Sequence, residues 1–116
     1  MKRSIGITSE QAMRAIRHHE FGDDVIASNR RVAVLLTQDW CPRWGAMKNW
    51  IYTLEDDFDL YELIYNKVDY FDDFRNFKET IWNNRLIPYV RYYRDGTLSA
   101  VSNDVTKEEF LKNLGL

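Results

Sequence analysis

Residues 31–44, RVAVLLTQDWCPRW, carry the strongest fold signal in this chain. Residues 31–37 are almost continuously apolar and β-branched, which is typical of a strand buried on both faces and predicts parallel neighbours. Pro42 favours the first position of a helix, because the N–H that proline lacks would be unpaired there in any case. The sequence therefore predicts a central strand, a short loop and a helix, with Cys41 at the junction.

Cys41 is the only cysteine of the chain. In the first turn of a helix, unpaired backbone N–H groups and the helix dipole would stabilise a thiolate. We therefore interpret Cys41 as a candidate catalytic nucleophile, in a loop made by Trp40, Pro42, Arg43 and Trp44. The alternative is an inert thiol, since free cysteines commonly pack as small hydrophobic side chains.

Composition limits the classes of protein that this chain can belong to. Its 116 residues, 45% of them hydrophobic, predict a single domain over residues 1–116. The 16 basic residues are scattered among 18 acidic ones, which argues against nucleic acid as a partner. One cysteine cannot close an intramolecular disulfide, and no apolar run resembles a signal peptide or a membrane span. We expect a cytoplasmic protein without a membrane partner.

Two elements are predicted before the central strand. Thr8 and Gln11 have the spacing of a capping box, and the apolar period after them predicts a helix over about residues 9–20. His19 falls on the apolar face of this helix, so we expect it to be partly buried. A short strand is predicted over residues 4–7.

The second half of the chain continues the alternation of strand and helix. The expected elements are a helix of about three turns from Pro42, a strand over residues 60–70, a helix from residue 71 to about residue 84, a hairpin of residues 87–93 and 97–101, and a terminal helix capped by Thr106. This order predicts an α/β protein with a central mixed sheet of four or five strands and about four flanking helices.

The whole chain resembles a thioredoxin-fold domain. Residues 40–44, WCPRW, stand in the place of that family's WCxxC active site. Ile87-Pro88, followed by a strand and Asp95-Gly96, is similar to the family's cis-proline loop and hairpin. The resemblance implies a cis bond at Pro88, and it implies that the backbone of Ile87 binds an extended substrate peptide by strand addition beside the cysteine.

Three departures from the family pattern limit what the resemblance implies. Trp44 replaces the resolving cysteine, so the usual two-thiol cycle cannot run within this chain. Leu35 stands where the family has a buried carboxylate that is thought to assist the resolving thiol. Arg43 beside Cys41 would favour a thiolate, whereas Asp39 would oppose it. The resemblance thus implies a monothiol protein whose partners are protein or peptide disulfides or small thiols.

Other interpretations stay open at this point. The chain could be a redox-inactive module that binds peptides or proteins in the same groove, because fold does not fix function. The chain resembles an iron–sulfur-carrying monothiol glutaredoxin less well, since the bulky side chains of Arg43 and Trp44 would crowd a bridging iron–sulfur cluster. No metal site is expected, because no Cys or His has metal-ligand spacing. We expect no cofactor beyond an external thiol such as glutathione. In the redox interpretation Trp40 and Trp44 would form an apolar rim, although the apolar stripe of its helix favours a core position for Trp44. Both a monomer and a weak dimer stay open.

Overall fold

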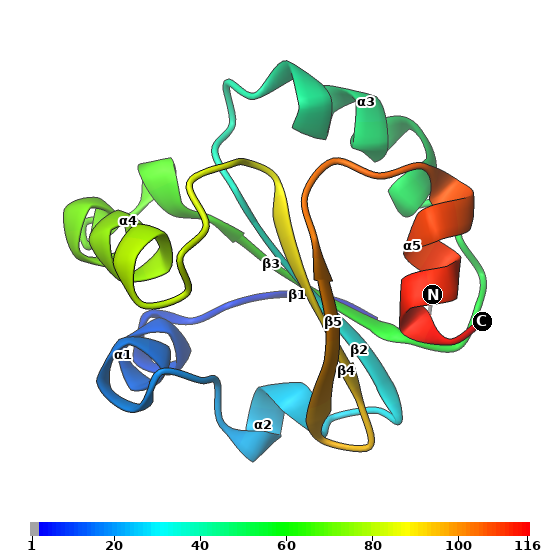
Figure 1. Ribbon diagram of the computed structural model, residues 1–116, viewed down its shortest axis with the longest axis horizontal. Helices are drawn as coiled ribbons and strands as arrows, with labels where there is room; N and C mark the ends of the chain where they lie inside the picture. Colours follow the sequence, from blue (N-terminus) through cyan, green and yellow to red (C-terminus); the bar gives the residue numbers. More distant parts are fainter. Residues whose placement is uncertain (1–2) are drawn as a thin grey trace.

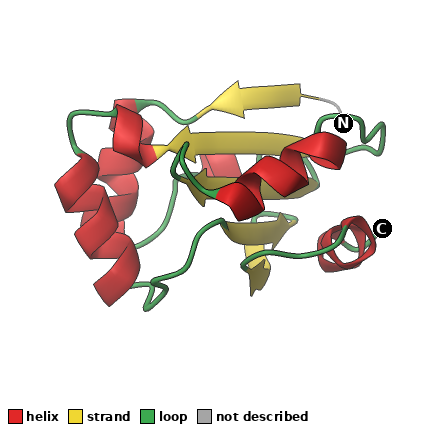
Figure 2. Ribbon diagram, turned by 90° about the horizontal axis from the view of Figure 1, so that it is seen from above, coloured by secondary structure: helices red, strands yellow, loops and turns green. Residues whose placement is uncertain are grey.

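A computed structural model describes residues 3–116, so the first two residues of the predicted domain lie outside the described part. One mixed sheet has the strand order β1-β3-β2-β4-β5, with helices on both faces (Figures 1 and 2). The strands are β1 (Arg3–Gly6), β2 (Arg31–Thr37), β3 (Asp59–Ile64), β4 (Tyr89–Arg94) and β5 (Thr97–Ser102). The helices are α1 (Ser9–His18), α2 (Asp23–Ile26), α3 (Pro42–Ile51), α4 (Phe71–Thr80) and α5 (Lys107–Leu114), with a 3-10 turn η1 (Tyr65–Lys67). The predicted α/β architecture is confirmed.

Strand β2 lies at the centre of the sheet, as the sequence predicts. It pairs parallel with β3 and antiparallel with β4, while β1 extends the parallel part and β5 the antiparallel part. Of its two neighbours, therefore, only β3 is parallel. Successive side chains of β2 point into two different cores, one on each face of the sheet, because side chains on a strand alternate between its faces. Val34 packs into the core with residues of α1, α2 and α4, and Leu35 into the core with residues of α3 and α5.

Three predicted elements end earlier than the sequence suggests. The helix expected from residue 71 to about residue 84 is α4, which ends at Thr80. The strand expected over residues 60–70 stops at Ile64, where the chain enters η1 and buries Tyr65. Helix α1 ends at His18, because His19 adopts the left-handed conformation with φ of 65°. His19 is exposed, so the expectation that it is partly buried on the apolar face is wrong. Its carbonyl accepts a hydrogen bond from Nε1 of Trp82 at 3.0 Å, which fixes the helix end against the loop after α4.

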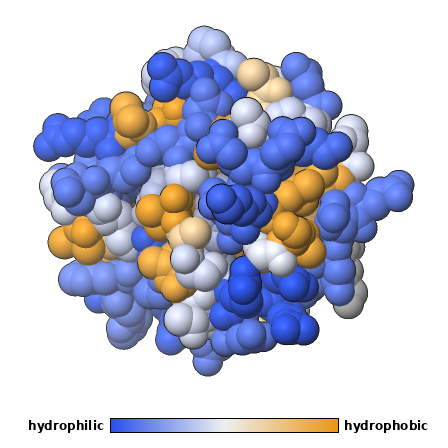
Figure 3. All heavy atoms as spheres, turned by 45° about the vertical axis from the view of Figure 1, so that its right-hand side comes forward, coloured by the Kyte–Doolittle hydropathy of each residue, from blue (hydrophilic) through white to orange (hydrophobic). Residues whose placement is uncertain are grey.

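The surface is mixed in polarity. Figure 3 shows hydrophobic side chains in separate patches among hydrophilic ones on the face it presents. Within residues 3–116, no helix is both long enough and apolar enough to cross a membrane.

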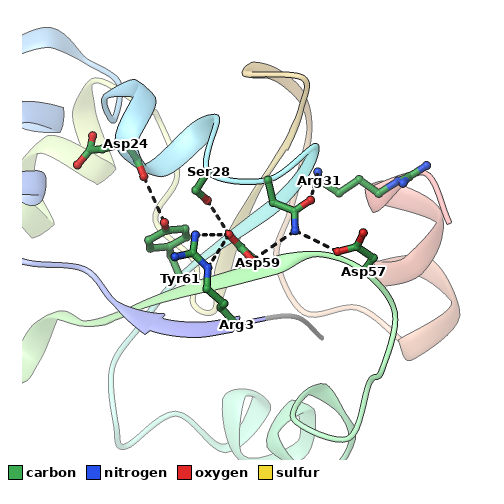
Figure 4. A network of polar contacts seen from close by, with 8 residues as sticks. Arg3, Asp24, Ser28, Arg31, Asp57, Asp59 and Tyr61 are labelled. Carbon is green, nitrogen blue, oxygen red and sulfur yellow. Dashed lines mark hydrogen bonds and ion pairs between the residues drawn. The ribbon is translucent and has the colours of Figure 1, made fainter.

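A buried carboxylate joins three segments at the start of β3 (Figure 4). The side chain of Asp59 is 1% exposed and accepts hydrogen bonds from Nη2 of Arg3 at 2.6 Å and Oγ of Ser28 at 2.8 Å. Nδ2 of Asn29 donates to its other oxygen at 3.4 Å. Burial alone would raise the pKa of Asp59, but the hydrogen bonds from Arg3, Ser28 and Asn29 outweigh it and hold the pKa below its usual value.

Replacing this carboxylate tests the network. We expect Asp59→Asn to lower the free energy of unfolding by about 2 kcal/mol at neutral pH, because charge-assisted hydrogen bonds are lost. Since the folded pKa of Asp59 lies below the unfolded one, its contribution is present above the unfolded pKa and is lost as pH falls through the folded pKa. Urea unfolding at neutral and strongly acidic pH measures both values. A difference between the two proteins that persists undiminished in acid would contradict this assignment.

Candidate functional site

Cys41 lies at the N-terminus of α3, directly after the loop that follows β2. It is the N-cap residue, with extended backbone angles (φ −72°, ψ 116°), and Pro42 occupies the first turn. The carbonyl of Cys41 already accepts the first helical hydrogen bond, from Gly45 N at 3.1 Å. The thiol therefore lies at the positive end of the helix dipole, which is the position that the sequence predicts.

The Cys41 side chain meets the loop before β4. Its Sγ donates a hydrogen bond to the carbonyl oxygen of Ile87 at 3.6 Å, across 46 residues of sequence. The Ile87–Pro88 peptide bond is cis, and Pro88 is buried. Cys41 is only 6% exposed, so the loop and the core cover most of its side chain. The structure thus brings together Cys41, which the sequence pattern predicts as a nucleophile, and Ile87 and Pro88, which the family resemblance predicts as the peptide-binding edge.

The other residues of the predicted loop divide between surface and core. Trp40 is 64% exposed, and its Nε1 donates to Oε1 of Gln38 at 2.6 Å. Pro42 and Arg43 are also exposed. Trp44 is 1% exposed, because it lies on the inward face of α3. The core position that the apolar stripe of the helix favours for Trp44 is confirmed, and the apolar rim made by Trp40 and Trp44 is wrong for Trp44.

Trp44 and Leu35 occupy the positions at which this chain departs from the thioredoxin pattern. Both are fully buried, and they belong to the same core cluster as Cys41. The indole of Trp44 packs edge-on against Tyr52, with ring centroids 6.1 Å apart. Among the described residues, Nε1 of Trp44 has no hydrogen-bond partner. Large apolar side chains thus fill this part of the core, and the indole N–H of Trp44 is left unsatisfied.

The carboxylate beside the cysteine is paired, which the sequence does not reveal. The carboxylate of Asp39 accepts hydrogen bonds from Nζ of Lys67 at 2.9 Å and from Nδ2 of Asn66 at 2.5 Å, and its backbone N–H donates to Oδ1 of Asn66 at 3.0 Å. These contacts with Lys67 and Asn66 hold the pKa of Asp39 below its usual value. The negative charge of Asp39, two residues before Cys41, is therefore offset by the ammonium group of Lys67.

Lys78 is a further residue of the site, one that the sequence does not single out. It comes from α4, its side chain is 0% exposed, and its Nζ donates to the carbonyls of Asn84 and Leu86, each at 2.8 Å. The side chain of Asn103 donates to the carbonyls of Leu86 and Pro88, at 3.3 Å and 3.1 Å. A signal was present, because Lys78 follows Phe74 by four residues on the apolar stripe of the helix.

Burial has an electrostatic consequence for Lys78. Desolvation lowers its pKa to about 8 from the ordinary value of 10.5, and Glu79 offsets this only in part. The charged form is therefore destabilised in the folded protein by about 3 kcal/mol.

Among residues 3–116, no cluster of three or more His, Cys, Asp or Glu side chains could hold a metal ion.

Comparison with known proteins identifies the fold. Neither a protein-family model nor a curated protein matches the chain. A mutant thioredoxin from Halobacterium salinarum superimposes with a TM-score of 0.65 at 16% identity, over 97% of this chain and 87% of that one. A putative oxidoreductase with a thioredoxin fold superimposes with a TM-score of 0.63 at 18% identity, over 95% of this chain and 92% of that one. Buckwheat glutaredoxin in complex with glutathione superimposes with a TM-score of 0.55 at 16% identity, over 93% of this chain and 90% of that one. The chain therefore has a thioredoxin-like fold.

The unpaired indole N–H gives a prediction for Trp44. Trp44→Phe removes this buried donor along with some volume, so we expect the free energy of unfolding to change by less than about 1.5 kcal/mol. Trp44→Ala leaves a cavity and should lower it by about 3–5 kcal/mol. Urea unfolding of both variants measures the difference. If the two substitutions were equally destabilising, the indole N–H would have a partner after all.

A second prediction concerns the pH dependence of stability. Between about pH 8 and pH 10.5 the unfolded chain binds more protons at Lys78 than the folded protein does, so the contribution of Lys78 to the free energy of unfolding rises with pH across this window. Lys78→Met has no such group. We expect the stability of the wild type relative to Lys78→Met to increase by up to about 3 kcal/mol across the window, measured by urea unfolding. A flat difference would show that Lys78 titrates normally.

Proposed function

We propose that this protein takes part in thiol–disulfide exchange as a monothiol, through mixed disulfides at Cys41. The observation that carries the proposal is the contact between Sγ of Cys41 and the carbonyl of Ile87. The only thiol of the chain therefore lies both at the N-terminus of α3 and beside the backbone of the loop before β4. The first position favours a nucleophilic sulfur, and the second offers a partner peptide a main-chain acceptor.

The exchange would proceed in two steps. The Cys41 thiolate attacks one sulfur of a partner disulfide, a new S–S bond forms, and the old bond breaks. The second partner sulfur leaves as a thiolate and takes a proton from water, so Cys41 is oxidised and the leaving sulfur is reduced. Because Trp44 replaces the resolving cysteine, an external thiolate must attack the partner's sulfur and release Cys41. Glutathione is a suitable external thiol, and the structurally similar buckwheat glutaredoxin is found in complex with it.

A partner would be recognised as an extended peptide. Its backbone N–H would donate to the carbonyl of Ile87 in place of the Cys41 thiol, which frees the sulfur for attack. The exposed ring of Trp40, next to the cysteine, supplies an apolar contact for the partner's side chains. Partners are therefore protein or peptide disulfides. The unpaired thiol also favours a reducing compartment, and we propose the cytoplasm.

A redox-inactive binding module is the second candidate function. One observation favours it: the Cys41 side chain is almost fully covered and already engaged with Ile87. In that case the loop would bind a peptide while the sulfur remained a small core side chain.

Adduct formation distinguishes the two candidates. We expect the folded wild type, incubated with glutathione disulfide or with a peptide carrying a glutathione mixed disulfide, to gain a single adduct that an excess of reduced glutathione removes. Intact-mass spectrometry measures the adduct. Cys41→Ser is the control and should gain none while keeping its circular dichroism. The redox proposal fails if the adduct forms only on the urea-unfolded chain. Retention of peptide binding by Cys41→Ser would then favour the binding module.

A further inference from the structure

Three successive carbonyl groups lie in the loop that faces the cysteine. The carbonyl of Leu86 accepts hydrogen bonds from Nζ of Lys78 at 2.8 Å and from Nδ2 of Asn103 at 3.3 Å. The carbonyl of Pro88 accepts from Nδ2 of Asn103 at 3.1 Å. Between them, the carbonyl of Ile87 accepts from Sγ of Cys41. Because the carbonyls before and after it are held by side chains, the Ile87 carbonyl has little freedom to turn away from the sulfur.

Lysine is an unusual residue at a fully buried position, because burial separates its charge from water. Lys78 is fully buried, and within residues 3–116 it makes no ion pair with a carboxylate. An apolar side chain could fill the same volume without the desolvation penalty of an ammonium group. A lysine adds three donors at one point, and its Nζ uses them on the Asn84 carbonyl, the Asn84 side chain and the Leu86 carbonyl. The ammonium therefore specifies the path of the loop rather than the packing of the core.

We propose that Lys78 and Asn103 are positioning residues that hold the Ile87 carbonyl over the Cys41 thiol, so that the sulfur stays covered until an extended peptide binds that carbonyl. This inference rests on the proposed function and deepens it, because it names what regulates access to the same sulfur. We call Lys78, Asn103 and the loop of residues 84–88 that they hold the carbonyl clamp.

The chemistry of the contact explains the regulation. A thiol can donate to the Ile87 carbonyl, but a thiolate has no proton to donate, and its charge would face the lone pairs of that oxygen. A small alkylating reagent offers nothing to the carbonyl and must reach a sulfur that the loop covers. A peptide N–H satisfies the carbonyl and removes the contact. The carbonyl clamp thus favours peptide disulfides over small reagents.

Two rate constants measured on the same variants test the proposal. In Lys78→Met and in Asn103→Ala, we expect alkylation of Cys41 by iodoacetamide at neutral pH to become at least about fivefold faster, because the loop is released. We expect mixed-disulfide formation with the glutathione-linked peptide to become at least about fivefold slower, because the peptide edge is no longer held in place. Phe77→Leu is the control, since Phe77 is buried on the same helix and belongs to the core cluster away from α3. It should change both rates by less than about twofold.

The opposite direction of the two changes separates positioning from a general loss of stability. Unchanged alkylation in both clamp variants would overturn the proposal, and so would an equal acceleration in Phe77→Leu. If Lys78→Met does not fold, Asn103→Ala decides alone, because Asn103 is only half-buried. Alkylation needs no partner, so its result stands even if the wild type forms no mixed disulfide. A wild type without an adduct would instead refute the proposed function.

Discussion

The antiparallel pairing of β2 with β4 creates the site. Leu36, near the end of β2, lies opposite Tyr89, the first residue of β4. The chain leaves β2 toward Cys41 at the same end of the sheet at which the loop through Pro88 enters β4. The two segments therefore meet although they are far apart in sequence. Burial of β2 on both faces holds this register, because a slip by one residue would turn Val34 and Leu35 to the wrong cores.

Around this meeting point the chain retains some features of the thioredoxin pattern and lacks others. The cysteine at the helix N-terminus and the proline loop are present, whereas Trp44 and Leu35 lie where the family pattern has a cysteine and a carboxylate, and they fill one apolar core. In the proposed function, both residues bear on the resolution of a mixed disulfide rather than on its formation. The polar contacts that remain lie on the loop, where Lys78 reaches it from α4 and Asn103 from the segment after β5. The half of the site that would meet a partner is therefore the half that side-chain hydrogen bonds hold in place.

Local patterns predict most elements of this fold, although not the short helix α2, and they do not predict the contacts between the elements. Strand β2, the start of α3 and the β4–β5 hairpin follow from residues adjacent in sequence, and Asp95 and Gly96 take the positive φ values that a tight hairpin turn requires. The left-handed turn at His19 has no comparable local signal. The partners of Asp39 and of Lys78 are set by tertiary packing: a lysine in an amphipathic helix is normally assigned to solvent, and only its place four residues after Phe74 indicates burial.

If the proposed function holds, the fold makes Cys41 a nucleophile for peptide disulfides rather than merely burying it. The decisive quantity is the second-order rate constant for reaction of Cys41 with a peptide disulfide, in the folded protein and in the urea-unfolded chain, at the same pH and after correction for the effect of urea on a free thiol. We expect a faster reaction in the folded protein, because the helix N-terminus and the Ile87 carbonyl act only there. A slower reaction in the folded protein would mean that the fold protects the thiol, and it would contradict the role proposed for Cys41.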